Sequence, residues 1–496
     1  MFSIRVTKTN SNARAVQVVS YAQRKVHVHK HIGSAHSDAD LKTLHSLARE
    51  WILAESDKGS LFSENRTVQL FNPQTCTVEK SQHRYCYEFL TALISRLEFS
   101  QFLPVIMHDL VVMRIIEPAS KLRSIELLDR YFSIHHTRQT YYDHIPIFLA
   151  TRDAIEAQAI ALAKHYYAFD FSLIFYDVTT LYYESFTPDE LRKPGFSKDG
   201  KSNQPQLVIG LVVTKEGFPV SYDIFPGNTF EGHTMIPIIL ALMKRHGIKH
   251  ATIVADAAMI SDSNITALKE AKLSYIVGAR LGNISNELFS TITEKTKQEH
   301  GRCFRTPTDK GDLIVEYSSD RYRKDAHELD KQIKKAQTHI ETPSRMKRAK
   351  FVRQTANQEF VLNEELIVKT HALLGLKGYY TNIPKTTPMG QIVLHYKTLW
   401  QIEKSFRMAK SDLQTRPIFS FTKYPIHAHI LLCFLALILG KHLELQLDIS
   451  LRRIMDELME LVDVSILDRS TSSRHIIKAE VPEVVKNWLK KLDLSY

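Results

Sequence analysis

The stretch SLIFYDVTTLYYES, residues 172–185, decides the fold class because it combines β-branched and aromatic residues with a polar break where a strand would end. Asp177 lies at that break. Two more strand-like runs follow, QLVIGLVV (206–213) and FPVSYDIF (218–225), and the turn residues KEG (215–217) separate them. The three runs together predict a three-stranded antiparallel meander.

Alternating helix and strand patterns continue downstream of the meander. The helical run 235–246 leads to the strand ATIVADAAM (251–259), which carries Asp256. A helix from about 263 to 271 then precedes the strand SYIVGAR (274–280). The predicted order is βββαβαβ, which is the topology of an RNase H-like core. The sequence therefore predicts the α/β fold class.

The flanking sequence divides the chain into five predicted regions. Short strands and charged stretches interrupt the core pattern, which resumes at GYYTNI (378–383). Alternation near the N-terminus predicts a small sheet, and helical spacing follows it. We expect an N-terminal β and helical DNA-binding region at 1–165, the first part of the catalytic core at 166–280, an inserted mixed β-rich module at 281–376, the second part of the core at 377–445 and a C-terminal helical region at 446–496.

The composition indicates a basic protein with an anionic partner. A net charge of +11 and a pI of ≈ 9.2 favour nucleic acid, because Lys and Arg contacts to phosphates release counterions; ribosome-associated and membrane-surface proteins share such a charge. The four cysteines form no C-x-x-C pair, which argues against a disulfide framework and a zinc site. No export signal is apparent, and the longest apolar run, 430–440, is too short to span a bilayer. We expect a cytoplasmic protein with no membrane partner.

Two aspartates and one glutamate form a candidate metal-binding triad. Asp177 and Asp256 each lie at a strand end and would converge if those strands are neighbours. Glu403, on a predicted helix, would complete the site. Two Mg²⁺ ions can stabilise the attacking and leaving oxygens of phosphodiester chemistry, and hard cations prefer carboxylates. The competing explanation is structural, since turn-forming and helix-capping roles account for most strand-end aspartates.

The predicted helix YKTLWQIEKSFRMAKSDL (396–413) presents the glutamate among polar and basic residues. Tyr396, Glu403 and Lys410 are spaced seven residues apart, so an unbroken α-helix would place them on one face. Arg407 would share that face. The alternative explanation is an ordinary i,i+4 salt bridge between Glu403 and Arg407 on an exposed helix.

The signature around Glu403 resembles that of bacterial insertion-sequence transposases of the DDE class, whose last acid lies in Y-x2-R-x3-E-x6-K and whose core carries a β-rich insertion. Here the signature reads Y-x2-L-x3-E-x6-K, with Leu399 where the family has Arg. The segments YDVTTLYYES (176–185), FPGNTFEGHT (225–234) and IVADAAM (253–259) match as well. The resemblance covers residues 173–440 well. The earlier residues resemble the family only in their general sequence pattern.

The resemblance implies a cut-and-paste DNA transposase, an enzyme that cuts and rejoins DNA. Asp177, Asp256 and Glu403 would be both catalytic and metal-binding, with two Mg²⁺ ions per site and Mn²⁺ able to substitute. Water would nick the element end, and the freed 3′-hydroxyl would then attack DNA.

DNA contacts and assembly also follow from the resemblance. Tyr396 and Lys410 would contact phosphates near the cleaved end, and Trp400 would pack near an unpaired base. Arg407 or Arg416 would replace the contact of the missing signature arginine. The partner would be double-stranded DNA, both terminal repeats and target, bound by a homodimer in the bacterial cytoplasm and at the nucleoid.

Three other functions fit parts of the sequence. Another RNase H-like nuclease would share the carboxylates and Mg²⁺, but the long insertion and the E-x6-K spacing argue against it. A domesticated, catalytically silent DNA-binding descendant would keep the fold, although the intact acidic triad counts against it. An RNA-binding role has the least support, because no RNP or KH motif is present.

Overall fold

The computed structural model describes residues 2–9, 13–22, 25–56, 76–183, 187–196, 203–259, 261–296, 299–341, 350–355, 359–469 and 471–494. Residues 184 and 185 of the opening stretch and parts of the predicted insertion lie outside these ranges. The chain forms two compact units. The first comprises Met1–Thr91, Leu127–Ile134 and Arg453–Tyr496, and the second comprises Ala92–Glu126 and His135–Arg452.

The N-terminal part of the first unit is a three-stranded antiparallel sheet covered by one helix. The elements are β1 (Phe2–Lys8), β2 (Arg14–Ala22), β3 (Lys25–Ala35) and α1 (Asp38–Ser56), and the strand order is β1-β2-β3. Buried aliphatic residues of β2 and α1 form the core between sheet and helix. The small sheet predicted for this region is therefore present.

A second sheet in the same unit joins segments that are far apart in the sequence. β4 (Cys76–Gln82), β16 (Asp463–Asp468) and β17 (Ser473–Ile477) are antiparallel, in the order β17-β16-β4. The C-terminal region, predicted to be helical, thus contains a hairpin as well as α16 (Glu483–Lys491). Pairing with β4 is a long-range contact, which local helical spacing does not reveal.

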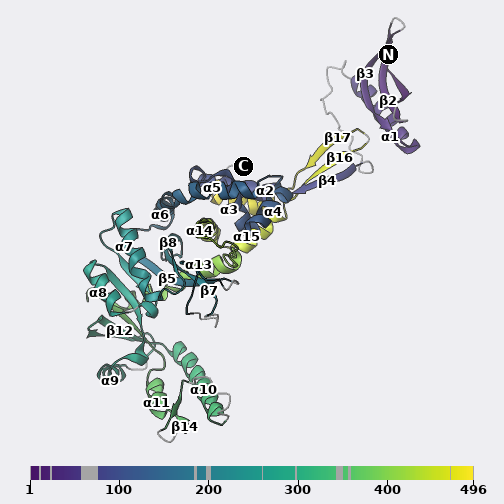
Figure 1. Ribbon diagram of the computed structural model, residues 1–496. Helices are drawn as coiled ribbons and strands as arrows, with labels where there is room; N and C mark the ends of the chain where they lie inside the picture. Colours follow the sequence, from purple (N-terminus) through teal and green to yellow (C-terminus); the bar gives the residue numbers. More distant parts are fainter. Residues whose placement is uncertain are drawn as a thin grey trace. The chain divides into compact units, whose positions relative to one another are not determined.

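The second unit is built on a nine-stranded mixed sheet (Figure 1). Its central elements are β5 (Leu173–Tyr182), β7 (Pro205–Val213), β8 (Pro219–Pro226), α7 (Met235–His246), β9 (Thr252–Ala255), α8 (Asp262–Glu270) and β10 (Ser274–Ala279). The strand order is β8-β7-β5-β9-β10, in which β5, β7 and β8 are antiparallel and β9 and β10 run parallel to β5. A two-residue strand, β6 (Lys193–Pro194), also pairs with β7. The order of these elements matches the predicted βββαβαβ.

The sheet continues beyond β10 into the predicted insertion. β15 (Leu376–Thr381) pairs antiparallel with β10, and β12 (Gly311–Tyr317) and β11 (Cys303–Thr308) follow outward. Part of the segment predicted as a separate module is therefore an extension of the main sheet.

The rest of the insertion is mixed rather than predominantly β-rich. It contains α9 (Asn286–Lys295), α10 (Ser319–Glu341), β13 (Val352–Gln354), β14 (Phe360–Leu362) and α11 (Glu364–Ala372). The longest of these elements is α10, where charged side chains one turn apart form ion pairs that stabilise the helix. Its apolar residues Tyr322, Ala326, Leu329, Ile333 and Ala336 recur every three or four positions and pack in one cluster, so the sequence does carry a helical period here.

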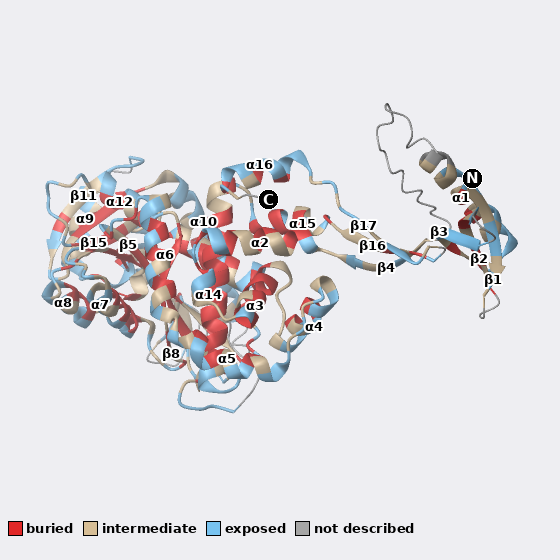
Figure 2. Ribbon diagram, turned by 90° about the horizontal axis from the view of Figure 1, so that it is seen from above, coloured by how far each residue is buried: buried red, intermediate tan, exposed pale blue. Residues whose placement is uncertain are grey.

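One long apolar helix, α14 (Lys423–Leu447), forms the core of the helical layer of the second unit. It packs against α3 (Val105–Ile116), α5 (Arg138–Ala150) and β8, and Figure 2 shows it as mainly buried. Among the described residues it is the one helix long and apolar enough to cross a membrane, yet 83% of its apolar window is buried inside the protein. Such burial is typical of a core helix. α6 (Arg152–Tyr167) also lies within this unit. The division between the two units runs through α2 (Arg84–Arg96), α4 (Lys121–Phe132) and α15 (Leu451–Met459).

Candidate active site

Two aspartates lie side by side at the centre of the main sheet. In the register of β5 and β9, Tyr176 is the partner of Ala255, so Asp177 and Asp256 occupy the next position along each chain. Neighbouring strands are about 4.8 Å apart, which makes the two carboxylates close neighbours. Each one accepts a hydrogen bond from the backbone N–H of the following residue, at 2.8 Å for Asp177 and 2.6 Å for Asp256. These bonds orient both side chains.

The segment that we expected to be one helix around Glu403 is divided into three. It consists of α12 (Met389–Lys397), α13 (Trp400–Arg407) and a π-helical turn, η8 (Met408–Asp412). Between the α-helices the backbone tightens, and the N–H of Leu399 bonds to the carbonyl of Tyr396, three residues earlier, at 2.9 Å. The π turn then widens the helix. The prediction of one unbroken helix is wrong, because these two changes of pitch reset the direction of the side chains.

The three acids predicted from the sequence line one cavity of ≈ 390 Å³, which we call the acid cavity. Asp177 and Asp256 come from the sheet, and Glu403 comes from α13. The structure therefore brings the predicted triad together around a common space. The acid cavity is lined by Asp177, Asp256, Glu316, Ser318, Arg321, Lys377, Tyr379, Tyr396, Lys397, Leu399, Trp400 and Glu403.

Tyr396 connects the helical wall of the acid cavity to the sheet. Its hydroxyl donates a long hydrogen bond to Oδ1 of Asp256 at 3.4 Å, and its ring lies 4.7 Å from that of Tyr379. Burial raises the pKa of Tyr396, and the charges of Asp256, Asp177 and Glu403 raise it further. The phenol therefore stays protonated at neutral pH and acts as a donor.

Basic side chains offset part of the negative charge of the acid cavity. Lys397 forms an ion pair with the buried Glu316, with Nζ and Oε1 2.6 Å apart. Lys377 lies over the ring of Tyr396 at 5.4 Å; burial and the nearby Arg321 lower its pKa, and the charge of Asp256 acts in the opposite direction. Lys397 therefore neutralises Glu316, and Lys377 lies within the electrostatic influence of Asp256.

Glu403 is exposed and forms no hydrogen bond or ion pair with the residues that the structure describes. The alternative salt bridge to Arg407 is thus not formed. Within the described ranges, no group of three or more His, Cys, Asp and Glu residues is arranged to hold a metal ion. The three acids share a cavity without converging on one point. Their carboxylates are nevertheless the donors that hard divalent cations prefer, and Asp177 and Asp256 form an adjacent pair.

A family model described as a transposase DDE domain matches residues 169–439, more than half of the chain. The chain belongs to the DDE transposase domain family. The match includes Asp177, Asp256 and Glu403, and members of this family generally use divalent metal ions.

Solved transposase structures are similar to this DDE protein only at low identity. The piggyBac transposase synaptic complex with hairpin DNA has 11% identity and a TM-score of 0.36, over 82% of this chain and 75% of that chain. The Mos1 transposase paired-end complex with the left transposon end has 11% identity and a TM-score of 0.16, over 46% of this chain and 66% of that chain. No curated protein sequence matches the chain.

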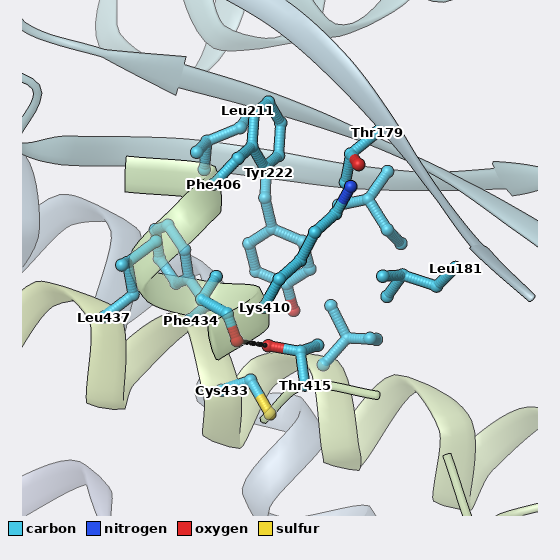
Figure 3. A pocket seen from close by; sticks show the side chains of 13 residues that line it. Thr179, Leu181, Leu211, Tyr222, Phe406, Lys410, Thr415, Cys433, Phe434 and Leu437 are labelled. Carbon is cyan, nitrogen blue, oxygen red and sulfur yellow. Dashed lines mark hydrogen bonds between the residues drawn. The ribbon is translucent and has the colours of Figure 1, made fainter. Parts of the chain in front are cut away.

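Lys410 of the DDE domain does not line the acid cavity. It lines a neighbouring, mainly apolar pocket, where its ammonium end points toward Thr179 on β5 (Figure 3). Thr179 is two residues beyond Asp177 and therefore lies on the same face of the strand, about 7 Å further along. Lys410 thus reaches the sheet face that carries the acids, by a route that helical spacing did not predict.

The other residues predicted to bind DNA are distributed around the DDE domain. Trp400 lines the acid cavity with 53% of its surface exposed, whereas Leu399 is buried in the wall at 8%. Arg407 is exposed on α13 but does not line the cavity. The guanidinium of Arg416 stacks on the ring of Tyr182 at 4.0 Å. The structure therefore groups Trp400 with the acids and places both arginines elsewhere.

Sequence reasoning missed the basic residues of the acid cavity, Arg321, Lys377 and Lys397. Lys377 had a detectable signal, because it is a charged residue inside the otherwise apolar strand β15. Arg321 had no such signal in the sequence, because it lies on a helix of the insertion whose position depends on the tertiary structure.

Proposed function

We propose that this DDE-family protein is a DNA transposase that binds insertion-sequence ends and catalyses phosphodiester hydrolysis followed by strand transfer. The observation that carries the proposal is the shared cavity of Asp177, Asp256 and Glu403 inside the matched family domain. The strand order β8-β7-β5-β9-β10, with three antiparallel and then two parallel strands, supports an RNase H-like core.

We propose Asp177, Asp256 and Glu403 as the ligands of two Mg²⁺ ions, for which Mn²⁺ can substitute. Bound there, the ions would stabilise charge on the attacking and leaving oxygens of the phosphodiester. The two aspartates present adjacent like charges that favour a divalent cation between them. Glu403 forms no ion pair with a described side chain, so its carboxylate is available as a ligand.

The remaining cavity residues hold the carboxylates and the DNA. Tyr396 donates to Asp256 and limits its rotation. Lys377 and Arg321 provide positive charge for a phosphate that enters the acid cavity. Trp400, which is half exposed at the cavity, offers a ring on which a base near the cleaved end can stack.

Double-stranded DNA is the proposed partner, and the net charge of +11 supports it. We propose that Lys410, Arg407 and Arg416 contact phosphates outside the acid cavity, and that the region 1–165 also binds DNA. Paired element ends require two protomers, so a homodimer on DNA in the bacterial cytoplasm is the proposed working form.

A cleavage and strand-transfer assay tests the proposal. The substrate is DNA with the native element ends, with and without Mg²⁺, and the variants are Asp177→Asn, Asp256→Asn and Glu403→Gln. We expect the wild type to cut and join, and each variant to bind the same DNA but to do neither. Cleavage without joining would indicate a nuclease, and equal cleavage by the variants would refute the triad.

Leu399 favours one second candidate, a catalytically silent DNA-binding protein. The side chain that replaces the signature arginine is buried in the wall of the acid cavity and offers no phosphate contact. Leu399→Arg discriminates between the two functions. A wild type that binds ends without cutting, together with a variant that cuts, would identify a silenced transposase.

A further inference from the structure

A second cavity, of ≈ 430 Å³, lies in the same unit and shares no residue with the acid cavity. Its walls come from the start of α4, from α5 and from the segment 419–425 that leads into α14. Two cationic residues, Lys121 and Arg138, line it together with hydroxyl and aromatic side chains. Among the described residues that form its wall there is no carboxylate. We call it the aromatic cavity.

The enclosed part of the aromatic cavity is lined by a buried tyrosine and a positively charged lysine. Tyr141 is 2% exposed, and its hydroxyl has no hydrogen-bond partner among the residues that the structure describes. Lys121 donates to the hydroxyl of Ser420, and its pKa is lowered to about 8 by burial and by the nearby Arg114. Because Lys121 pairs with no carboxylate of the described residues, its ammonium is available to an anion.

The open part of the aromatic cavity exposes large flat side chains. Tyr142, Phe419 and Phe421 line it with 42%, 55% and 52% of their surfaces exposed. The guanidinium of Arg138 lies 5.5 Å over the ring of Tyr142, and that of Arg192 lies 5.5 Å over Phe421. Neighbouring exposed aromatic rings indicate an interaction surface rather than a packing requirement.

We propose that the aromatic cavity binds one unpaired nucleotide of single-stranded DNA. The phosphate contacts Lys121 and Arg138, and the base stacks on Phe419, Phe421 or Tyr142. Cations beside stacking rings are the combination that single-stranded nucleic acid requires, because every base has an aromatic face and every nucleotide a phosphate. An acidic protein partner would not explain the exposed aromatic rings. An apolar partner would not explain Lys121 and Arg138, which pair with no carboxylate of the described residues. This inference rests on the proposed DNA-processing function.

Fluorescence binding with the full-length protein tests the inference. The probe is a thymidine oligonucleotide of about 12 nucleotides with one 2-aminopurine, whose emission falls when it stacks. In the double variant Phe419→Ala/Phe421→Ala we expect roughly tenfold weaker single-strand binding and loss of the quench, with affinity for blunt duplex DNA unchanged. Tyr424→Ala is the matched control, because Tyr424 is 69% exposed on the same segment but does not line the cavity.

Arg138→Gln is a second variant that does not depend on a repacked core, because Arg138 is exposed. We expect it to weaken single-strand binding severalfold and to reduce its salt dependence by about one phosphate contact. Unchanged single-strand affinity and quench in both variants would overturn the inference.

The strand-transfer assay separates this inference from the proposed function. A wild type that cuts and joins, with variants that bind single strands normally, refutes the aromatic cavity and leaves the transposase intact. Conversely, single-strand binding that depends on Phe419 and Phe421, in a protein that never cuts, refutes the enzyme alone.

Discussion

The hydroxyl of Tyr396, at the end of α12, donates a hydrogen bond of 3.4 Å to Oδ1 of Asp256, at the end of β9. The contact joins residues 140 positions apart and fixes α12 against the centre of the main sheet. It also makes the tyrosine part of the acid cavity rather than of the surface, since Tyr396 is 8% exposed. The orientation of Asp256 thus depends on Tyr396, which belongs to α12.

Tyr396→Phe removes this donor and keeps the ring. We expect DNA cleavage to slow about two- to tenfold, because the loss of one hydrogen bond to a carboxylate costs about 0.5–1.5 kcal/mol. Single-turnover cleavage of element-end DNA measures the rate. Tyr380→Phe on β15 is the matched control, since Tyr380 does not line the acid cavity, and an equal loss in both variants would contradict the assignment.

Divalent metal should stabilise the folded protein through the adjacent aspartates. At a Mg²⁺ concentration of about 100 Kd the linkage adds about 2.7 kcal/mol to the free energy of unfolding, which thermal unfolding detects as a higher Tm. Asp256→Asn should abolish that increase. Asp262→Asn should keep it, because Asp262 lies on α8 outside the acid cavity. A Tm increase with Mg²⁺ that is retained in Asp256→Asn would rule out metal binding at Asp177 and Asp256.

Lys397→Met should destabilise the fold through Glu316. The variant leaves a buried carboxylate without the ammonium that lies 2.6 Å away, and we expect a loss of about 1 kcal/mol, since the lysine side chain is itself 54% exposed. Urea denaturation measures the free energy of unfolding. The double variant Lys397→Met/Glu316→Gln should recover most of the loss, and no recovery would show that the lysine acts through another partner.

Gly278→Ala should displace Tyr396. A Cβ at this position would overlap the Tyr396 hydroxyl and lie 3.1 Å from the backbone nitrogen of Ala257, so the ring must move. We expect a cost of about 1–3 kcal/mol and slower cleavage. Gly282→Ala, where nothing lies within 4 Å of the added Cβ, is the control. Wild-type cleavage and stability in Gly278→Ala would refute the close fit.

Stability should fall at mildly acidic pH through His442. This residue is 2% exposed, and burial with the nearby Arg96 lowers its pKa to about 4 from the usual 6.5. The folded state keeps the imidazole neutral while the unfolded chain protonates it. The contribution of the neutral His442 to the free energy of unfolding is therefore complete above about pH 6.5. It is lost as the pH falls toward 4, by up to about 1.4 kcal/mol per pH unit.

Urea denaturation at several pH values checks this dependence. His442→Gln should flatten the profile between pH 6.5 and 4, because the titrating group is gone. His250→Gln, at an exposed position, should leave it unchanged. A His442→Gln profile as steep as that of the wild type would assign the acid sensitivity to other buried groups.

The sequence alone determined the order of the central elements. The strands of the meander and the two helices that follow it are local patterns of apolar and β-branched residues, which neighbouring positions in the chain reveal. Asp256 could be assigned to the end of its strand for the same reason. Asp177 was also predicted at a strand end but lies within β5, because the strand continues to Tyr182. Glu403 could be selected because its neighbours match a known signature.

The tertiary structure alone decided which side chains meet. The division of the Glu403 segment into α12, α13 and η8 moved Lys410 to the pocket of Thr179, because a break and a π turn change the pitch that residue spacing assumes. The pairing of β4 with β16, and the approach of Lys121 to Ser420, join residues separated by hundreds of positions. Such contacts arise from packing and burial across the whole chain, which no local pattern encodes.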